Sequence, residues 1–271
     1  MPVFKDQIGR SFELKEIPRR IVSLVPSQTE MLVDLGLENS IVGVTKFCVH
    51  PERIRSEKTI VGGTKNLHLV RVENLDPDFI IANKEENTRE DIEALAEKYP
   101  VYVSDIENIQ DAKSFALDIG ALTGNDDKAR VLVSQIDRAL MSLKNLTENS
   151  NPVSVLYMIW KDPYMAAGTD SFITEMLNLC GVHNVLDKWH EAGLRYPEVS
   201  LDQISALNPG IILLSSEPYP FKKTQAVELS IQTGIKTMLV NGEIFSWYGS
   251  RLIHTLPELK NFVQEITDHF R

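Results

Sequence analysis

The sequence predicts an α/β protein of two lobes, each a mostly parallel sheet with helices on both faces, joined by one long helix. Short β-branched runs alternate with helical stretches in both halves of the chain, and a single long amphipathic segment separates the halves. We therefore expect an N-terminal lobe over residues 1–125, a backbone helix over 126–147 and a C-terminal lobe over 152–271.

In the first half, runs of apolar and β-branched residues predict buried strands at 21–24, 41–45, 79–82 and 101–103. Two helices are indicated by their capping sequences. Ser27-Gln28-Thr29-Glu30 has the form of a capping box, in which the serine oxygen accepts from a helical amide and Glu30 reaches back, and this helix should run to Gly36. Asn87-Thr88-Arg89-Glu90 has the same form and should begin a helix that runs toward Lys98.

The second half repeats the pattern. Strands are predicted at 153–158, 211–214 and 238–240, and helices at 171–179, 201–207 and 250–270. Ser200-Leu201-Asp202-Gln203 is a further capping box. Because these strands also alternate with helices, the second lobe should resemble the first.

The joining segment has its apolar residues three and four positions apart, which predicts a helix with one buried stripe. Asn125, Asp126 and Asp127 suit its N-terminus, where a cap and acidic side chains are favourable. At 1.5 Å per residue the helix would be roughly 33 Å long, enough to cross from one lobe to the other. A ligand should then bind between the lobes, at the carboxyl ends of the strands.

Composition excludes several classes of protein. The chain holds 28 Lys+Arg against 38 Asp+Glu, a formal net charge of -10, so we expect no nucleic acid partner. The two cysteines are too few and too distant for a disulfide scaffold or a zinc finger. Since the first residues have no signal-peptide pattern, we expect a periplasmic or cell-envelope protein if a signal has been removed, and a cytoplasmic one if Met1 is the native start.

Several segments match one known family in their order and spacing. They begin with Asp6-Gln7-Ile8-Gly9-Arg10 and the run from Pro18 to Glu30, and continue with residues 42–45, 75–81, 168–184, 198–200 and 207–209. On these segments the chain resembles the helical-backbone metal-receptor family, the substrate-binding proteins of ABC transporters for cobalamin, haem and ferric siderophores. In pattern it is most similar to the cobalamin-binding members.

The resemblance implies a function and a set of site residues. The chain should bind a metal chelate in the cleft between its lobes, a corrinoid first and a ferric siderophore or haem as the alternative, with no covalent cofactor. Position by position, the ligand contacts carried over from the family fall at His50, Gly62, Gly63, Thr64, Lys65, Trp160, Tyr196, Glu243 and Trp247.

The family also docks onto an ABC permease through one acidic residue on each lobe. Here the first position falls at Val70-Arg71, which has no carboxylate, and the second falls at Asp202. We expect a monomer, with Asp202 as its candidate docking residue.

Other candidates come from the residues themselves. Glu85 and Glu86 follow a predicted strand and are either a specificity loop or a solvated turn with Asn87 as the helix cap. Arg251 either meets an anionic group of the ligand or pairs with Glu243, and an ion pair is the more frequent outcome.

His50 either ligates a metal or lines the site, whereas Cys48 reads as a small buried thiol. The chain has no nucleophile elbow, P-loop or HExxH motif, so we expect no enzyme. The alternative from a different functional class is an enzyme that acts on a corrinoid or haem in the cleft.

Overall fold

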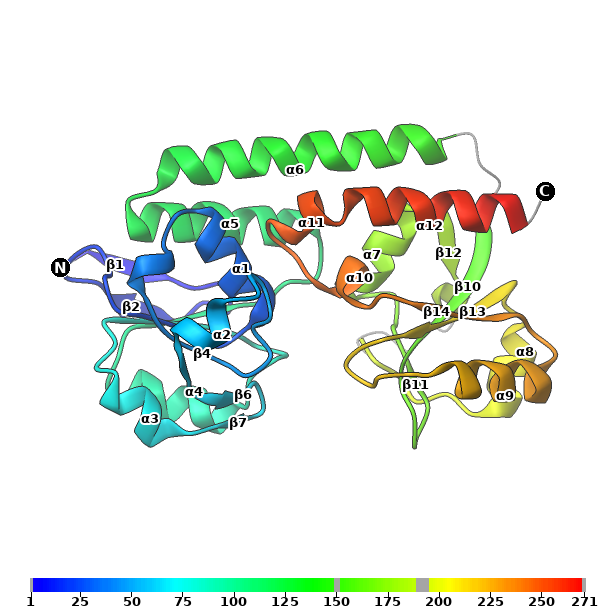
Figure 1. Ribbon diagram of the computed structural model, residues 1–271, viewed down its shortest axis with the longest axis horizontal. Helices are drawn as coiled ribbons and strands as arrows, with labels where there is room; N and C mark the ends of the chain where they lie inside the picture. Colours follow the sequence, from blue (N-terminus) through cyan, green and yellow to red (C-terminus); the bar gives the residue numbers. More distant parts are fainter. Residues whose placement is uncertain (1, 149–151, 189–194, 270–271) are drawn as a thin grey trace. The chain divides into compact units, whose positions relative to one another are not determined.

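The computed structural model describes residues 2–148, 152–188 and 195–269. The chain divides into two compact units (Figure 1): unit 1 is Met1–Ile136 with Tyr248–Arg251, and unit 2 is Asp137–Trp247 with Leu252–Arg271. The predicted two-lobed α/β fold is confirmed, and α6 (Asp126–Thr147) runs uninterrupted from one unit into the other. The boundary between the units falls within α6, and the chain returns once more to unit 1 over four residues near its end.

Unit 1 is built on a five-stranded sheet in which every neighbouring pair is parallel. The strand order is β5-β4-β3-β8-β9. The bounds are β3 Ile21–Ser23, β4 Ile41–Val44, β5 Thr59–Ile60, β8 Phe79–Asn83 and β9 Val101–Ser104. Because the strands are parallel, their carboxyl ends share one edge of the sheet.

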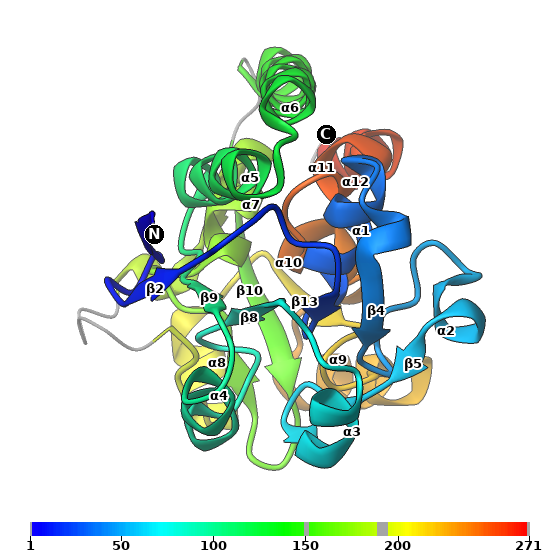
Figure 2. The same cartoon turned by 90° about the vertical axis from the view of Figure 1, so that its left-hand side faces the viewer.

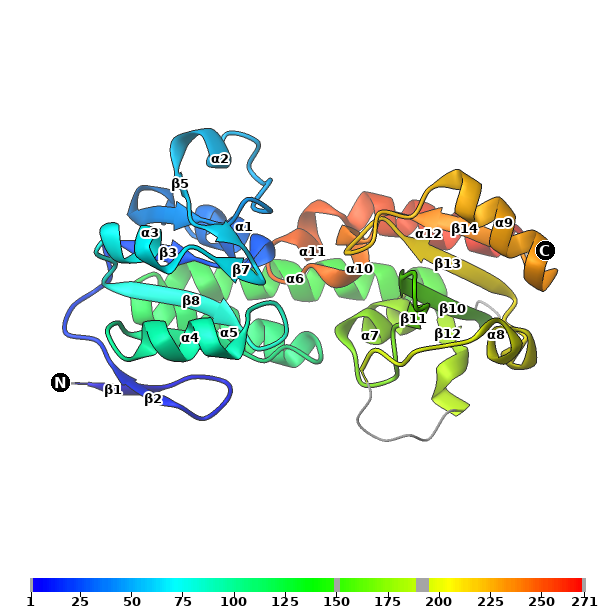
Figure 3. The same cartoon turned by 90° about the horizontal axis from the view of Figure 1, so that it is seen from below.

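Helices cover both faces of this sheet (Figure 2), with α3 and α4 on one side and α5 on the other. The alternation of side chains explains the layers, since Val22 and Leu24 pack with α3 and α4 whereas Tyr102 packs against Phe115 of α5. The helices are α1 Pro26–Asp34, α2 Ile54–Glu57, α3 Leu69–Asn74, α4 Arg89–Ala96, α5 Ile109–Thr123 and the 3-10 turn Glu38–Ser40. Two hairpins complete the unit, β1 Val3–Lys5 with β2 Ser11–Glu13 (Figure 3) and β6 Gly62–Gly63 with β7 Asn66–Leu67.

Unit 2 has a mixed five-stranded sheet whose path is β11-β10-β13-β14, with β12 paired to β10. Only β11 is antiparallel. The bounds are β10 Val153–Trp160, β11 Met165–Ala166, β12 Val182–Asn184, β13 Ile211–Ser215 and β14 Thr237–Val240.

Helices again cover both faces of this sheet (Figure 1), with α7 and α12 on one side and α8 and α9 on the other. Leu156 and Met158 of β10 face the core shared with α8 and α9, whereas Tyr157 packs against Phe245 of α10. The helices are α7 Phe172–Leu179, α8 Leu201–Leu207, α9 Lys223–Thr233, α10 Glu243–Ser246, α11 Arg251–His254, α12 Leu256–His269 and the 3-10 turn Val185–Lys188. Of the helices in the described ranges, none has the length and apolar character needed to cross a membrane.

Two of the predicted capping boxes are wrong. Helix α1 begins at Pro26, two residues earlier than a cap at Ser27 predicts, because proline is preorganised for the first helical position. Its cap residue Val25 makes no side-chain capping bond. Helix α4 is preceded by Thr88 at the cap position rather than Asn87. The capping box of Ser200 with Gln203 is confirmed, with backbone-to-side-chain bonds of 3.2 and 2.7 Å.

The predicted helix over 250–270 is interrupted, and Phe270 lies outside the described residues. Helix α11 ends at His254 and α12 begins at Leu256. Pro257 explains the break, because its ring lacks an N–H donor and would clash with the carbonyl of the preceding turn. The prediction missed this break because the apolar spacing continues through it.

The segment Tyr248–Arg251 belongs to unit 1 and is held there by polar and packing contacts. The Tyr248 hydroxyl accepts from Gln28 Nε2 at 2.8 Å, and the Arg251 guanidinium lies 2.8 Å from a carboxylate oxygen of Glu30. Gly249 has a φ of +76°, and a Cβ there would come within 3.2 Å of Met31. This conformation therefore favours glycine, and the segment is anchored to α1 through Tyr248 and Arg251.

Candidate functional site

The carboxyl edge of the unit 2 sheet gathers side chains from three parallel strands. Trp160 ends β10, the segment 216–221 follows β13, and the segment 241–247 follows β14. Since β10, β13 and β14 pair in parallel, these three segments meet at one edge. This is where an α/β sheet presents a ligand site.

Trp160 is the most exposed aromatic of this edge. Its side chain is 40% exposed, and its ring packs edge-to-face on Tyr219 with 5.6 Å between centroids. Gln225 of α9 donates from Nε2 to the Tyr219 hydroxyl at 2.7 Å. An exposed indole on a supported aromatic ring offers a flat apolar surface to a ligand.

Trp247 lies at the same edge but is only 7% exposed. Its indole Nε1 donates to Glu217 Oε1 at 2.8 Å, and the Ser246 hydroxyl donates to the same oxygen at 2.6 Å. Glu243, which begins α10, is half-buried, and its backbone N–H bonds Asn241 Oδ1 at 3.2 Å. Ligand contact by Trp247 and Glu243 stays a prediction.

Tyr196 is half-buried and lies beside β11, because Ala166 donates its amide to the Pro197 carbonyl at 3.0 Å. Arg251 forms an ion pair, which was the expected outcome. Its partner is Glu30 of the same unit rather than the predicted Glu243. The guanidinium is 8% exposed, so its chief role is structural. A contact of Arg251 with ligand stays a prediction.

In unit 1, the predicted residue Gly63 ends β6, and Thr64 and Lys65 form the turn between β6 and β7. Gly62 precedes the turn with a φ of +121°, and a Cβ there would lie 2.4 Å from a backbone oxygen, so only glycine fits. Thr64 is buried and accepts at its carbonyl from Asn87 Nδ2 at 3.1 Å. The Lys65 ammonium donates to the carbonyl of Glu85, which brings this turn and the loop after β8 together.

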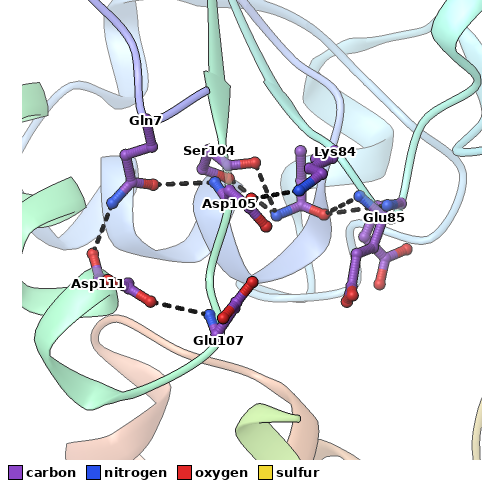
Figure 4. A network of polar contacts seen from close by, with 9 residues as sticks. Gln7, Lys84, Glu85, Ser104, Asp105, Glu107 and Asp111 are labelled. Carbon is purple, nitrogen blue, oxygen red and sulfur yellow. Dashed lines mark hydrogen bonds and ion pairs between the residues drawn. The ribbon is translucent and has the colours of Figure 1, made fainter. Parts of the chain in front are cut away.

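The loop after β8 is held by Asn83, whose Oδ1 accepts from the amides of Glu85 and Glu86 at 2.8 and 3.0 Å. Asn87 is not the helix cap, because its side chain is used within the loop, accepting from the Asn83 amide at 2.9 Å. Figure 4 shows the Glu85 side chain extending away from this network. The loop is therefore held by the side chains of Asn83 and Asn87, and ligand contact by Glu85 or Glu86 stays a prediction.

The same edge of unit 1 continues at the end of β9 (Figure 4). Lys84 pairs with Asp105 at 2.5 Å, and Gln7 bridges two segments by accepting from the Asp105 amide at 3.1 Å and donating to the Asp111 carbonyl at 2.9 Å. The Glu107 amide bonds Asp111 Oδ2 at 3.1 Å. These bonds order an edge on which carboxylates outnumber ammonium groups.

His50 follows β4 and is half-buried. Within the described ranges no three His, Cys, Asp or Glu side chains gather as a metal site. Cys48 is buried and bonds the hydroxyls of Thr29 and Thr45 at 3.1 and 3.3 Å, as expected for a small packed thiol. The role of His50 toward a ligand metal stays a prediction.

The two positions considered for permease docking both lie on the surface. Asp202 is exposed in the first turn of α8, directly behind its capping box. Val70 of α3 is 68% exposed, and the adjacent Arg71 donates to the Ile60 carbonyl at 3.2 Å. Only the second position offers a carboxylate.

Both cysteines should be inert in the folded protein. Burial raises the pKa of the Cys180 thiol to about 12 and also raises the pKa of Cys48. Because the thiol pKa is higher in the folded chain than in the unfolded chain, only the unfolded chain gains by ionising as the pH rises. The stability of the folded state is therefore unaffected by the thiols below about pH 9 and falls as the pH rises from there toward 12. At pH 8, a thiol-specific disulfide reagent should label neither cysteine in the native state and both in 6 M guanidinium; rapid native labelling would contradict the burial.

Sequence reasoning missed Glu217 and Tyr219, which contact the two candidate tryptophans. Both lie within five residues after the predicted strand 211–214, and that position was the available signal. The motif Glu217-Pro218-Tyr219-Pro220 reads as an ordinary turn, so nothing local distinguished it.

Comparison with known proteins places the chain among binding proteins. A family model described as "Periplasmic binding protein" matches residues 21–241. A vitamin B12-binding protein of Pectobacterium carotovorum is 22% identical over 240 residues, covering 88% of this chain and 85% of that protein. Among solved structures, the periplasmic vitamin B12 binding protein of Vibrio cholerae matches with a TM-score of 0.76 at 19% identity, covering 92% of this chain and 98% of that one. The apo periplasmic heme-binding protein of Roseiflexus sp. RS-1 matches with a TM-score of 0.79 at 17% identity, covering 92% and 99%.

Proposed function

Because the chain belongs to the periplasmic binding protein family, we propose that it binds a corrinoid as the substrate-binding component of an ABC-type uptake system. The family membership expected from the sequence is confirmed, and from this membership we infer a binding protein rather than an enzyme. The observation that carries the proposal is the exposed Trp160 ring, supported by Tyr219 at the carboxyl edge of a parallel sheet. The similarity to vitamin B12-binding proteins over most of the chain supports the choice of a corrinoid.

The charges at the two sheet edges support a corrinoid over haem. Glu243 lies at the edge in unit 2, and Glu85 and Glu107 lie at the edge in unit 1. Carboxylates accept hydrogen bonds from the neutral amides around a corrin, whereas they repel the propionates of haem. Haem or a ferric siderophore remains the second candidate, supported by His50 as an iron ligand and the exposed ammonium of Lys65.

The ligand class is tested by titrating the protein with cyanocobalamin, dicyanocobinamide, haemin and ferrioxamine B, following quenching of tryptophan fluorescence. We expect cyanocobalamin or dicyanocobinamide to bind with a Kd well below about 0.1 mM, which corresponds to roughly -5.5 kcal/mol. The chelate should be recovered unchanged, as expected of a receptor. Failure of all four to bind below that value contradicts the proposal, and turnover of a chelate would favour the enzyme alternative.

Trp160 is the residue whose loss should affect binding without affecting the fold. Trp160→Ala removes a flat contact surface, and aromatic anchors of this kind contribute about 2 kcal/mol or more, roughly a 30-fold loss of affinity. Because the ring is 40% exposed, the free energy of unfolding should fall by no more than about 1 kcal/mol. Isothermal titration calorimetry measures the Kd, and urea denaturation measures the free energy of unfolding. An unchanged Kd would show that Trp160 does not contact the ligand.

We further propose a periplasmic location, a monomeric state and docking onto the permease through Asp202. Asp202→Lys should leave the Kd for cyanocobalamin unchanged but slow association with the permease by about tenfold or more. Corrinoid uptake by cells that carry the variant in place of the wild type measures this. Glu265→Lys on α12, another exposed carboxylate of unit 2, is the matched control. Equal uptake by both variants would refute docking at Asp202.

A further inference from the structure

We infer that the loop after β13, residues 216–221, positions both tryptophans of the unit 2 edge, with Tyr219 supporting Trp160 and Glu217 holding Trp247. Tyr219 and Glu217 do not touch the proposed ligand. Each acts through the indole beside it. The inference rests on the proposed function, since it explains how the same edge presents its aromatic rings.

Tyr219 connects the exposed Trp160 to the buried core. Its ring lies 5.6 Å from Trp160 at 69° and 4.7 Å from Phe221 at 61°, both edge-to-face arrangements. Phe221 is buried in the core cluster that β10 and β13 share with α8 and α9. The Tyr219 hydroxyl is fixed by Gln225, and its amide donates to the Ile159 carbonyl at 3.3 Å. The support under Trp160 is therefore continuous with the core.

Glu217 joins the loops that follow β13 and β14. One of its oxygens, Oε1, accepts from both Trp247 Nε1 and the Ser246 hydroxyl. The Ser215 hydroxyl donates to the Glu217 carbonyl at 2.5 Å and accepts from the Tyr157 hydroxyl at 3.1 Å. Both backbone and side chain of Glu217 are thus held, so the carboxylate fixes the plane of the Trp247 indole.

The close approach of the two loops depends on Gly242. A Cβ at Gly242 would lie 2.4 Å from Ser215 Oγ and 2.5 Å from Glu217 Cγ, and its amide donates to Ser216 Oγ at 2.9 Å. Glycine lets the backbone after β14 lie against the Glu217 side chain. The loops are therefore coupled by backbone, hydroxyl and carboxylate contacts together.

Preorganised rings bind more tightly because less side-chain freedom is lost when the ligand arrives. Removing the support should therefore weaken binding without removing any ligand-contacting group. We expect Tyr219→Ala and Glu217→Ala each to raise the Kd for cyanocobalamin by about fivefold. Tyr219→Phe keeps the ring and Glu217→Gln keeps the acceptor oxygen, so both should stay within about twofold of the wild type.

The test combines these Kd values with the three tryptophan indole signals in 15N spectra, assigned by Trp→Phe variants. In the ligand-free protein, Tyr219→Ala should lower the heteronuclear NOE of the Trp160 indole, and Glu217→Ala should shift the Trp247 indole proton upfield. Tyr219→Phe and Glu217→Gln should restore both signals. Tyr99→Ala, which removes a half-buried tyrosine packed on the core of unit 1, is the control and should change neither.

Unchanged indole signals and an unchanged Kd in Tyr219→Ala and Glu217→Ala would overturn the inference. So would a Tyr219→Phe variant as impaired as Tyr219→Ala, because the ring would then not be the support. If Tyr219→Ala does not fold, Tyr219→Leu keeps apolar volume without the ring and must show the same loss. If the wild type binds no chelate, the proposed function fails, whereas the ligand-free spectra still decide whether the loop positions the indoles.

Discussion

Replacing Arg251 by methionine should lower the free energy of unfolding by about 3–5 kcal/mol. Arg251 and Glu30 are both buried, and the guanidinium Nε lies 2.8 Å from Oε2 of Glu30. Without the guanidinium, the Glu30 carboxylate is left buried with its opposite charge missing. The loss should be largest in α1 and in the segment Tyr248–Arg251, which the pair anchors together.

The matched control is the double variant Glu30→Met/Arg251→Met. Apolar side chains in place of a buried ion pair are commonly neutral in stability, so the double variant should recover most of the loss. Trp160 and Trp247 lie outside unit 1, so their fluorescence does not report on it directly. Far-UV circular dichroism and hydrogen exchange of α1 are the suitable measurements. A single variant as stable as the wild type would show that the pair contributes nothing.

Trp247→Ala should destabilise the fold by about 3–5 kcal/mol, because the side chain is buried and its indole N–H is bonded to Glu217. If the ring also forms part of the ligand surface, the affinity for cyanocobalamin should fall by about tenfold or more. Urea denaturation and isothermal titration separate these effects. A large loss of stability with an unchanged affinity would make Trp247 a packing residue and leave Trp160 as the aromatic wall of unit 2.

The architecture could be predicted because its signals are local. The alternation of β-branched runs with helices and the apolar stripe of α6 each depend on neighbouring residues. The capping box at Ser200 was recognised for the same reason. Ser27 does not cap α1 because Pro26 starts the helix two residues earlier than that cap predicts. Asn87 does not cap α4 because its side-chain amide accepts from the Asn83 N–H and donates to the Thr64 carbonyl.

The contacts that organise the candidate site are long-range, and the sequence does not reveal them. Glu30 and Arg251 are 221 positions apart, and Glu217 and Trp247 are 30 apart. Each residue alone reads as an ordinary charge or turn. Only the parallel register of β13 beside β10 and β14 brings Glu217 and Tyr219 next to the two tryptophans.

The claim that this chain is a corrinoid receptor is tested most directly by equilibrium dialysis against cyanocobalamin, with bound ligand read from its visible absorbance. We expect saturable binding of one cyanocobalamin per chain with a Kd below about 0.1 mM. Trp160→Ala should retain much less ligand, and intact cyanocobalamin should be fully recovered after denaturation. Equal concentrations of cyanocobalamin on both sides of the dialysis membrane throughout the titration would show that the chain is not a corrinoid receptor.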